Sequence, residues 1–430
     1  MQAMCESVSS IVSSGFTTVI GFLALCLMQF LIGPDLGLAL AKGISISLIA
    51  VFTLMPNMIL VSLKLTDRLH HRNFMPGFDG FARVVRRLMI PCLVLLCVMV
   101  VPAYLASNAN SFYYGGSEVF GEETQLGADT EKIEEVFGKS DTCVLMVPKG
   151  STADQQSLSD ALHELSEVTD IISYVDTVGA EIPESYLDEE TLSLLNSENY
   201  TRMIITVDAD YEGEETFALV EEIREIAREY YPDSWYLAGQ GVSTYDLMDT
   251  ITSDMVKVNL TAILAVFIVL LITMKSLSLP AILVLCIEAA IWINLAIPYF
   301  MDNPVFYLCY LIISSIQLGI TVDYAILLTN RYLECRTRMN RGKAVEQTVS
   351  SVFVSILTSC SVLVVVGFAM GLSSTNGLLS QLGYFLGVGA VCAFVMVFFV
   401  LPGMLYVLDS VIQRTTRNIK FYKEEEGVEK

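Results

Sequence analysis

The stretch FYLCYLIISSIQLGITVDYAILLT, residues 306–329, decides the fold class of this sequence. It is long enough to cross a bilayer as a helix, which takes about 20 mainly apolar residues. It nevertheless carries a carboxylate, Asp323, well inside the apolar run. Seven further stretches resemble it in length and composition, so the sequence predicts an α-helical polytopic membrane protein with eight transmembrane helices. The eight predicted spans are residues 9–30, 36–63, 88–107, 256–274, 279–300, 306–329, 348–370 and 379–408.

The composition separates one acidic segment from the membrane part. The chain has 430 residues, of which 53% are hydrophobic, and it carries 47 acidic and 25 basic residues. Residues 108–255 alone hold 33 acidic and 6 basic residues, which leaves 14 acidic and 19 basic residues elsewhere. The sequence therefore predicts an acidic domain set into a mildly basic membrane protein. Such acidity would repel phosphate groups, so no nucleic-acid partner is expected.

The basic residues predict the orientation. Lys and Arg gather after the second and sixth predicted spans, whereas the short links 301–304 and 371–374 contain neither. The positive-inside rule then places both termini in the cytoplasm and residues 108–255 outside it. The predicted organisation is a transmembrane helix pair (1–63), a basic cytoplasmic connector (64–87), one transmembrane helix (88–107), an extracytoplasmic acidic α+β domain (108–255), a five-helix transmembrane bundle (256–408) and a cytoplasmic tail (409–430).

The acidic domain shows alternating strand and helix patterns. The predicted order suggests a small α+β sandwich, with a ferredoxin-like arrangement as the candidate fold. Its acidic runs at 188–190 and 212–215 lack the ligand spacing of a calcium loop, so they are interpreted as a solvated surface and no metal site is predicted. The predicted strands are 141–148, 171–178, 203–207 and 235–237, and the predicted helices are 154–168, 187–195 and 217–231.

The first two spans repeat in the last two. A shift of 346 residues superposes them without a gap and aligns Ser, Gly and Pro as well as apolar residues, which chance composition explains poorly. The second copy follows an external domain and three spans, so we expect the first copy to follow the same elements. These would precede Met1, and we interpret the chain as the C-terminal part of a twelve-span protein with two parallel repeats. The coinciding pairs are Val8/Val354, Ser9/Ser355, Ser13/Ser359, Gly21/Gly367, Phe22/Phe368, Gly37/Gly383, Gly43/Gly389, Pro56/Pro402 and Met58/Met404.

Two carboxylates lie inside predicted spans, Glu288 and Asp323. An ionisable group there costs on the order of 3 kcal/mol unless it is paired or solvated, so a function is suspected for each. Asp323 is followed by Tyr324, and Ser315, Gly319 and Asp323 form one small, polar stripe at a spacing of four residues. The next span carries a stripe of Ser351, Ser355 and Ser359, with Thr358 beside it.

A carboxyl that faces hydroxyls in a partly wet seam can bind and release a proton. We therefore predict a proton relay of Asp323 and Tyr324, supported by Gly319, Ser355, Thr358 and Ser359. The alternative is that Asp323 is a protonated carboxyl that only holds helices together. Glu288 has no obvious partner in the sequence and stays a possible intramembrane acid.

These residues resemble the RND superfamily, and most closely its MMPL branch. The resemblance rests on Gly319-Ile320-Thr321-Val322-Asp323-Tyr324, on the order of spans and external domain, and on the repeat. It implies that the acidic domain is porter-like and that Asp323-Tyr324 is the pair on the tenth of twelve helices. It also implies export of hydrophobic or lipid-like molecules, driven by the proton motive force, across the bacterial cell membrane. The chain departs from the family by lacking spans one to four, the first porter domain and the first Asp-Tyr pair.

The implied partners are the lipid bilayer, a hydrophobic or lipid substrate, and the missing N-terminal half or a separately encoded partner half. Assembly of the chain with copies of itself stays open. A non-transporting lipid sensor, a SecDF-like secretion accessory and a non-functional truncated product are the alternatives. The three histidines form no triad and no phosphate-binding glycine loop occurs, so neither an enzyme nor a cofactor is predicted.

Overall fold

The computed structural model describes residues 2–68, 77–114, 124–182, 186, 189–417, 419 and 421–422. Its contacts divide the chain into two compact units. The helical unit comprises residues 1–112, 253–374 and 378–430, and the α+β unit comprises residues 113–252 and 375–377. Each unit is described by itself.

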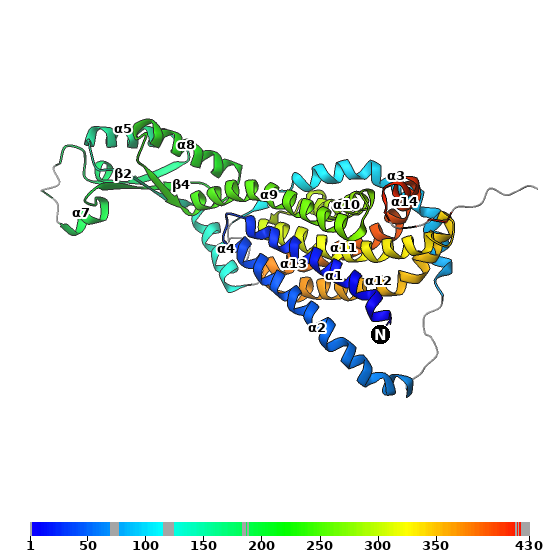
Figure 1. The fold of residues 1–430 in the computed structure, drawn as a ribbon. Coiled ribbons are helices and arrows are strands. Elements are labelled where there is room, and N and C mark those ends of the chain that lie inside the picture. Colours follow the sequence, from blue (N-terminus) through cyan, green and yellow to red (C-terminus); the bar gives the residue numbers. More distant parts are fainter. Residues whose placement is uncertain are drawn as a thin grey trace, which may run out of the picture. The chain divides into compact units, whose positions relative to one another are not determined.

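The helical unit is built from long apolar helices (Figure 1). Short elements join them: the turn η1 (Leu25–Leu27), strand β1 (Phe112–Tyr113) at the boundary of the units, strand β6 (Val305–Phe306), and the π-helical turn η3 (Met396–Val400). The helices are α1 (Gln2–Ala24), α2 (Ile32–Arg68), α3 (Asp79–Asn108), α9 (Gln240–Met274), whose first residues belong to the α+β unit, α10 (Ser278–Met301), α11 (Tyr307–Arg336), α12 (Arg341–Ser373), α13 (Gly377–Val395), α14 (Leu401–Val407) and α15 (Asp409–Thr415).

Among the described residues, seven segments are long and apolar enough to cross a membrane. They coincide with seven of the eight predicted spans. The first predicted span, residues 9–30, falls on α1, whose described apolar part is the shorter segment Gly15–Leu27. The predicted fold class, a polytopic helical membrane protein with an α+β domain, is confirmed. The seven segments are Ile32–Leu63, Asp79–Asn108, Gln240–Met274, Ser278–Met301, Tyr307–Arg336, Arg341–Ser373 and Gly377–Val407.

Glycines let α12 and α13 approach very closely. A methyl carbon on Gly383 would lie 2.4 Å from the backbone nitrogen of Gly371, and one on Gly367 would lie 2.5 Å from the nitrogen of Gly387. The two glycines of each helix are four residues apart, the small-xxx-small spacing that lets membrane helices pack backbone to backbone. At Gly37, the repeat equivalent of Gly383, a methyl carbon would lie 2.7 Å from the carbonyl oxygen of Phe22, so α1 and α2 meet in a similar way.

We expect Gly383→Ala to destabilise the helical unit. The clash is with backbone, which cannot rotate away, so the helices must separate at a cost of about 1–3 kcal/mol. Thermal unfolding in detergent measures this cost. Gly43→Ala is the matched control, because no atom lies within 4 Å of a methyl carbon there. Equal melting temperatures of the two variants would contradict the close packing.

The α+β unit contains a four-stranded antiparallel sheet in the order β3-β4-β2-β5 (Figure 1). With strand–helix–strand twice along the chain, this order is that of a ferredoxin-like fold, as the sequence suggested. Its elements are α4 (Gln125–Phe137), β2 (Asp141–Pro148), α5 (Thr152–His163), β3 (Val168–Ile172), α6 (Tyr174–Thr177), α7 (Glu189–Leu195), β4 (Tyr200–Val207), α8 (Glu214–Tyr230) and β5 (Tyr236–Gly239).

Alternate residues of β2 and β4 face helices α5 and α8 and form the core of this unit. Leu158 and Leu162 from α5 and Ile223 from α8 lie against Leu145 and its strand neighbours, all nearly inaccessible to solvent. The free thiol of Cys143 belongs to the same core, and its burial raises its pKa to about 12. The thiol is therefore an inert packing group.

The predicted strand 171–178 is wrong in its second half. Strand β3 ends at Ile172, and residues Tyr174–Thr177 form the short helix α6. The Ser173 hydroxyl accepts a hydrogen bond from the Asp176 amide and so caps this helix. A Ser followed three residues later by an acidic residue is a helix start signal, which outweighs the apolar alternation of the segment. The first two residues of the predicted helix 187–195 lie outside the described residues.

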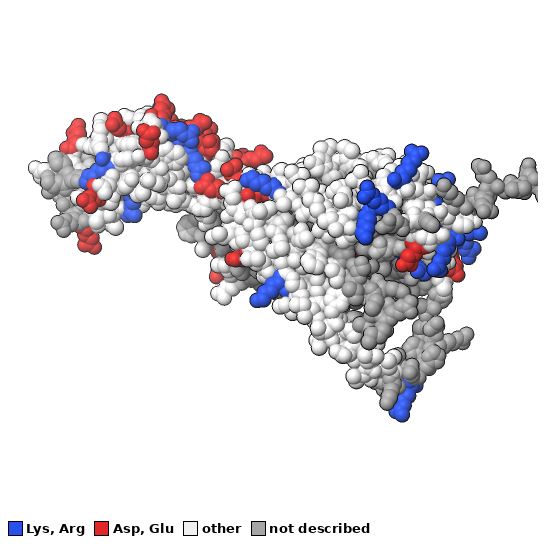
Figure 2. All heavy atoms as spheres, viewed as in Figure 1, with Lys and Arg blue, Asp and Glu red and all other residues white. Residues whose placement is uncertain are grey.

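Charge is distributed unevenly over each unit. Figure 2 shows acidic side chains gathered over the α+β unit, whereas the helical unit shows a broad uncharged surface with basic side chains gathered mainly at one end. Apolar side chains make up that surface; Met58 of α2, Val98 of α3 and Val365 of α12 are all more than 60% exposed. Such a surface suits contact with lipid chains.

Candidate functional site

The predicted relay pair lies in the middle of helix α11. Tyr324 is buried and Asp323 is half-buried. Helix α11 packs against α1 and also against α12, the two helices that the repeat relates. Both residues are about 20–25 Å from either end of α11 at a rise of 1.5 Å per residue. The pair is therefore held deep in the helical unit.

The relay tyrosine reaches the hydroxyl stripe of α12. The Tyr324 hydroxyl and the Ser359 hydroxyl form a hydrogen bond of 3.2 Å. The supporting residues Ser355, Thr358 and Ser359 all lie on the exposed side of α12, and the Thr358 hydroxyl donates to the carbonyl of Val354 in its own helix. The structure thus joins Tyr324 to Ser359, whereas no bond described here connects Ser355 or Thr358 to the pair.

Gly319 allows α11 to approach α1. A methyl carbon on Gly319 would lie 2.7 Å from the side-chain methyl group of Thr18. Thr17, next to it, is buried, so α1 presents hydroxyl side chains to this contact. Hydroxyls thus lie on both helices that flank α11, Thr18 on α1 and Ser359 on α12. This arrangement fits a carboxyl that exchanges a proton through short polar contacts.

Ser359→Ala removes the one described side-chain partner of the Tyr324 hydroxyl. We expect a loss of about 1 kcal/mol in the free energy of unfolding, because Tyr324 stays buried. Ser361→Ala is the control, since the Ser361 hydroxyl donates to the carbonyl of Leu357 in its own helix. Thermal unfolding is measured on both variants, and identical melting temperatures would contradict a stabilising role for the bond.

Glu288 lies apart from the relay pair. It sits in the middle of α10 and lines a pocket between α9, α10 and α11. The amide of Asn294, further along the same helix, donates to the Gln317 side chain at 2.8 Å and to the carbonyl of Phe385 at 3.1 Å.

Sequence reasoning missed this Asn294–Gln317 cluster. The Gln317 amide donates to the carbonyl of Ala290 at 3.0 Å, and Gly389 leaves room for both side chains. The cluster joins α10, α11 and α13, and each buried amide is bonded across helices. Asn294 and Gln317 are polar residues in apolar spans, which marks them as unusual in the sequence. The sequence does not reveal their partners, because these lie 23 or more residues away along the chain.

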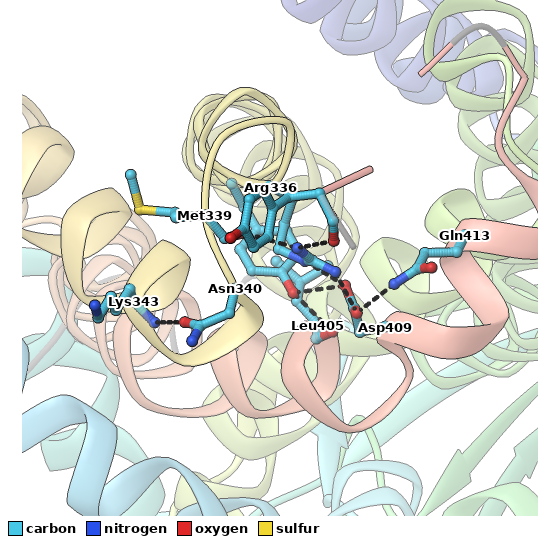
Figure 3. A network of polar contacts seen from close by, with 9 residues as sticks. Arg336, Met339, Asn340, Lys343, Leu405, Asp409 and Gln413 are labelled. Atoms are coloured by element: carbon cyan, nitrogen blue, oxygen red, sulfur yellow. Dashed lines mark hydrogen bonds and ion pairs between the residues drawn. The ribbon is translucent and has the colours of Figure 1, made fainter. Parts of the chain in front are cut away.

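A second missed network lies at the end of α11 (Figure 3). Arg336 forms a two-pronged ion pair with Asp409, with nitrogen–oxygen distances of 2.9 Å, and both side chains are at most 5% exposed. The hydroxyl of Tyr332 and the amide of Gln413 donate to the same carboxylate at 2.9 and 2.8 Å. The sequence places Arg336 in the basic segment after the sixth predicted span and Asp409 in the predicted tail. Neither segment by itself indicates that the two residues pair. We call these four residues the Arg336 clamp.

The Arg336 clamp fixes the charge of Asp409. Burial raises the pKa of this carboxyl, but hydrogen bonds from Arg336 and Tyr332 and the guanidinium charge lower it more. The net pKa lies below the ordinary value, so Asp409 is charged at neutral pH. The clamp holds α11 to the chain around α14 and α15 and has no titrating role near pH 7.

Among the residues that the structure describes, no group of three His, Cys, Asp or Glu side chains could hold a metal ion. The Asp323 carboxyl and the hydroxyls of Tyr324 and Ser359 are groups that can form hydrogen bonds and exchange protons.

Comparison with known proteins places the chain in a family. The model of the MMPL family matches residues 1–74 and 119–421. Comparison with curated proteins gives no match. The fold is similar to that of SecDF in a super-membrane-facing form, with 12% identity and a TM-score of 0.53. It is also similar to SecDF, a translocon-associated membrane protein from Thermus thermophilus, with 11% identity and a TM-score of 0.56.

Each of these two alignments covers 95% of this chain and 49% of the SecDF chain. The chain therefore spans about half the length of these structures. Identities this low show the fold alone. The family match covers most of the chain. The chain belongs to the MMPL family.

Proposed function

We propose that the chain takes part in proton-driven export of hydrophobic or lipid-like molecules across the bacterial cell membrane. Asp323 binds and releases the proton, and Tyr324 links it to α12. The α+β unit lies outside the cytoplasm and handles the exported molecule, and both termini lie in the cytoplasm. The chain itself performs no enzymatic reaction and needs no cofactor.

The observation that carries this proposal is the position of Asp323 on α11. It is a half-buried carboxyl in a membrane-length helix, and such groups persist mainly where they are paired or used. Its neighbour Tyr324 is bonded to Ser359 on α12, and α1 packs on the same helix. A change in the protonation of Asp323 alters polar contacts of α11, which gives the proton a route to helix packing.

Family membership supports the substrate class. The apolar surface of the helical unit gives lipid-like molecules access from the bilayer, and no phosphate-binding glycine loop offers ATP as a driving force. A partner half supplies the external domain and the spans that we expect before the first copy of the repeat. It is encoded by the same gene or by a separate one. Association of copies of the chain is a further route to a complete assembly.

The second candidate function is that of a secretion accessory, favoured by the fold likeness to SecDF, a translocon-associated membrane protein. Two assays in cells that lack the native protein separate the candidates. In one, the efflux of a lipophilic fluorescent dye is followed after re-expression. In the other, the rate of secretion of a reporter protein is followed. An exporter restores dye efflux and leaves secretion unchanged, whereas an accessory does the reverse.

The partner half is tested by the size of the native protein. Blotting of native membranes with an antibody to residues 413–430 gives a band near twice 47.4 kDa if both halves are one chain. A band at 47.4 kDa requires a separately encoded half, or another copy of the chain, that co-purifies with it. The partner proposal would be contradicted if the blot showed no band near twice 47.4 kDa and nothing co-purified with the 47.4 kDa chain.

A further inference from the structure

A small pocket, with room for a group the size of about two water molecules, lies between α9, α10 and α11 of the helical unit. All three helices contribute residues to its lining. Asp323 and Tyr324 are not among these residues. Ser315 lines the pocket and is eight residues from Asp323, which is about 12 Å along α11. The polar and aromatic lining residues are Asn259, Glu288, Trp292, Tyr310, Ser314 and Ser315.

Glu288 is the charged side chain of this lining. It is only 9% exposed, and within the described parts of the chain no hydrogen bond or ion pair reaches its carboxyl. An unpaired carboxylate is strongly disfavoured when it is buried in a membrane helix. The pocket therefore calls for a positive group beside Glu288, or for a proton on it.

The other walls favour an organic cation over a metal ion. Trp292 and Tyr310 contribute aromatic rings, and Ile263, Leu295 and Leu318 contribute apolar surface. Hard metal ions prefer sites made of several charged or carbonyl oxygens, whereas this pocket has one carboxylate. Aromatic rings beside a carboxylate suit an ammonium group with an alkyl body, because the ring faces attract the cation.

We propose that this pocket binds the ammonium group of an amphiphile. The ammonium pairs with the Glu288 carboxylate between the rings of Trp292 and Tyr310, and the alkyl body lies along the apolar wall. The outer face of α9 is apolar and open, with Val256, Leu260 and Leu264 more than half exposed, so the ligand enters from the bilayer. This inference concerns equilibrium binding and holds with or without proton-driven export.

Trp292 is a built-in reporter for the test. The chain has only two tryptophans, and the other, Trp235, lies in the α+β unit. The full chain carrying Trp235→Phe is placed in nanodiscs of phosphatidylglycerol, which has no ammonium group. Trp292 fluorescence is then titrated with hexylammonium, whose head group is about the size of a water molecule. Hexanol, which keeps the alkyl chain without the charge, is titrated in parallel.

We expect saturable binding of hexylammonium and at least tenfold weaker binding of hexanol. Glu288→Gln weakens cation binding about tenfold or more, since it removes the charged partner. Glu346→Gln, which changes an exposed acid paired with Arg86, leaves the affinity unchanged. Equal affinity in the wild type and Glu288→Gln, or equal affinity for hexanol, would overturn the proposal and leave Glu288 as a protonated core residue.

A second variant guards against misfolding. Ala262→Leu adds volume at the buried α9 wall and keeps Glu288, so it weakens binding while the melting temperature reports folding. Unchanged binding in a folded Ala262→Leu protein would also contradict the pocket. Nanodiscs of phosphatidylethanolamine identify the source of the ammonium. Weakened binding of the probe there shows that the lipid headgroup occupies the pocket, and unchanged binding shows that it takes a separate amphiphile.

Discussion

Asp323→Asn is expected to reduce the proposed proton-driven efflux to the level of vesicles without the protein. The asparagine side chain has the size of the carboxyl and can still form hydrogen bonds, but it cannot bind and release a proton near neutral pH. Helix packing around α11 is therefore kept while the coupling is lost. The effect is measured as the rate of efflux of a lipophilic dye from energised membrane vesicles, above the rate of vesicles without the protein. We expect this rate to fall about a hundredfold.

The control for this variant is Asp302→Asn. Asp302 follows α10 in a left-handed conformation and is exposed, a position that asparagine also accepts. It is expected to transport normally. Melting temperatures of both variants establish that they are folded. Normal efflux by Asp323→Asn would show that Asp323 only stabilises the helices.

Asp409→Ala is expected to have the largest effect on stability. It leaves the Arg336 guanidinium buried without its carboxylate, and breaking a buried pair in this way costs about 3–5 kcal/mol. Chemical or thermal unfolding in detergent measures the loss. Glu346→Gln breaks the exposed Arg86–Glu346 pair instead and is expected to cost less than about 1 kcal/mol.

The double variant Arg336→Met, Asp409→Leu separates charge pairing from packing. Replacement of both charges by apolar groups is often neutral or stabilising, so it should recover most of the lost stability. The pH dependence has a definite sign. Because the folded pKa of Asp409 is lowered, its stabilisation is complete above the ordinary carboxyl pKa and is lost as the pH falls through the lowered value. An Asp409→Ala protein as stable as the wild type would contradict the clamp.

Local patterns predicted the elements of this fold well. The apolar stretch 306–329 became α11, which runs on to Arg336 because the basic segment after it is also helical. The alternation in 141–148 became β2 with the same bounds. The glycines that recur in the repeat mark close helix contacts, as at Gly37 and Gly383. In each case the deciding information lies within one element or in its copy.

What escaped prediction depends on contacts between distant segments. Arg336 and Asp409 are 73 residues apart, and neither looks unusual in its own segment. Glu288 was recognised as an intramembrane acid, but its pocket is lined from three helices and no sequence spacing reveals it. The hydroxyl stripe of α12 was recognised as a whole, yet only the fold shows that Ser359 meets Tyr324.

The most direct test of the proposed coupling is proton entry into proteoliposomes that contain the full chain, alone and with any co-purifying half. The solution outside the proteoliposomes, on the extracytoplasmic face of the protein, is made acidic. A pH-sensitive dye trapped inside reports the pH of the lumen. We predict that the lumen acidifies faster when an exported amphiphile is present, and that Asp323→Asn removes this difference. Equal acidification in the wild type and Asp323→Asn, with the amphiphile present, would contradict proton coupling through Asp323.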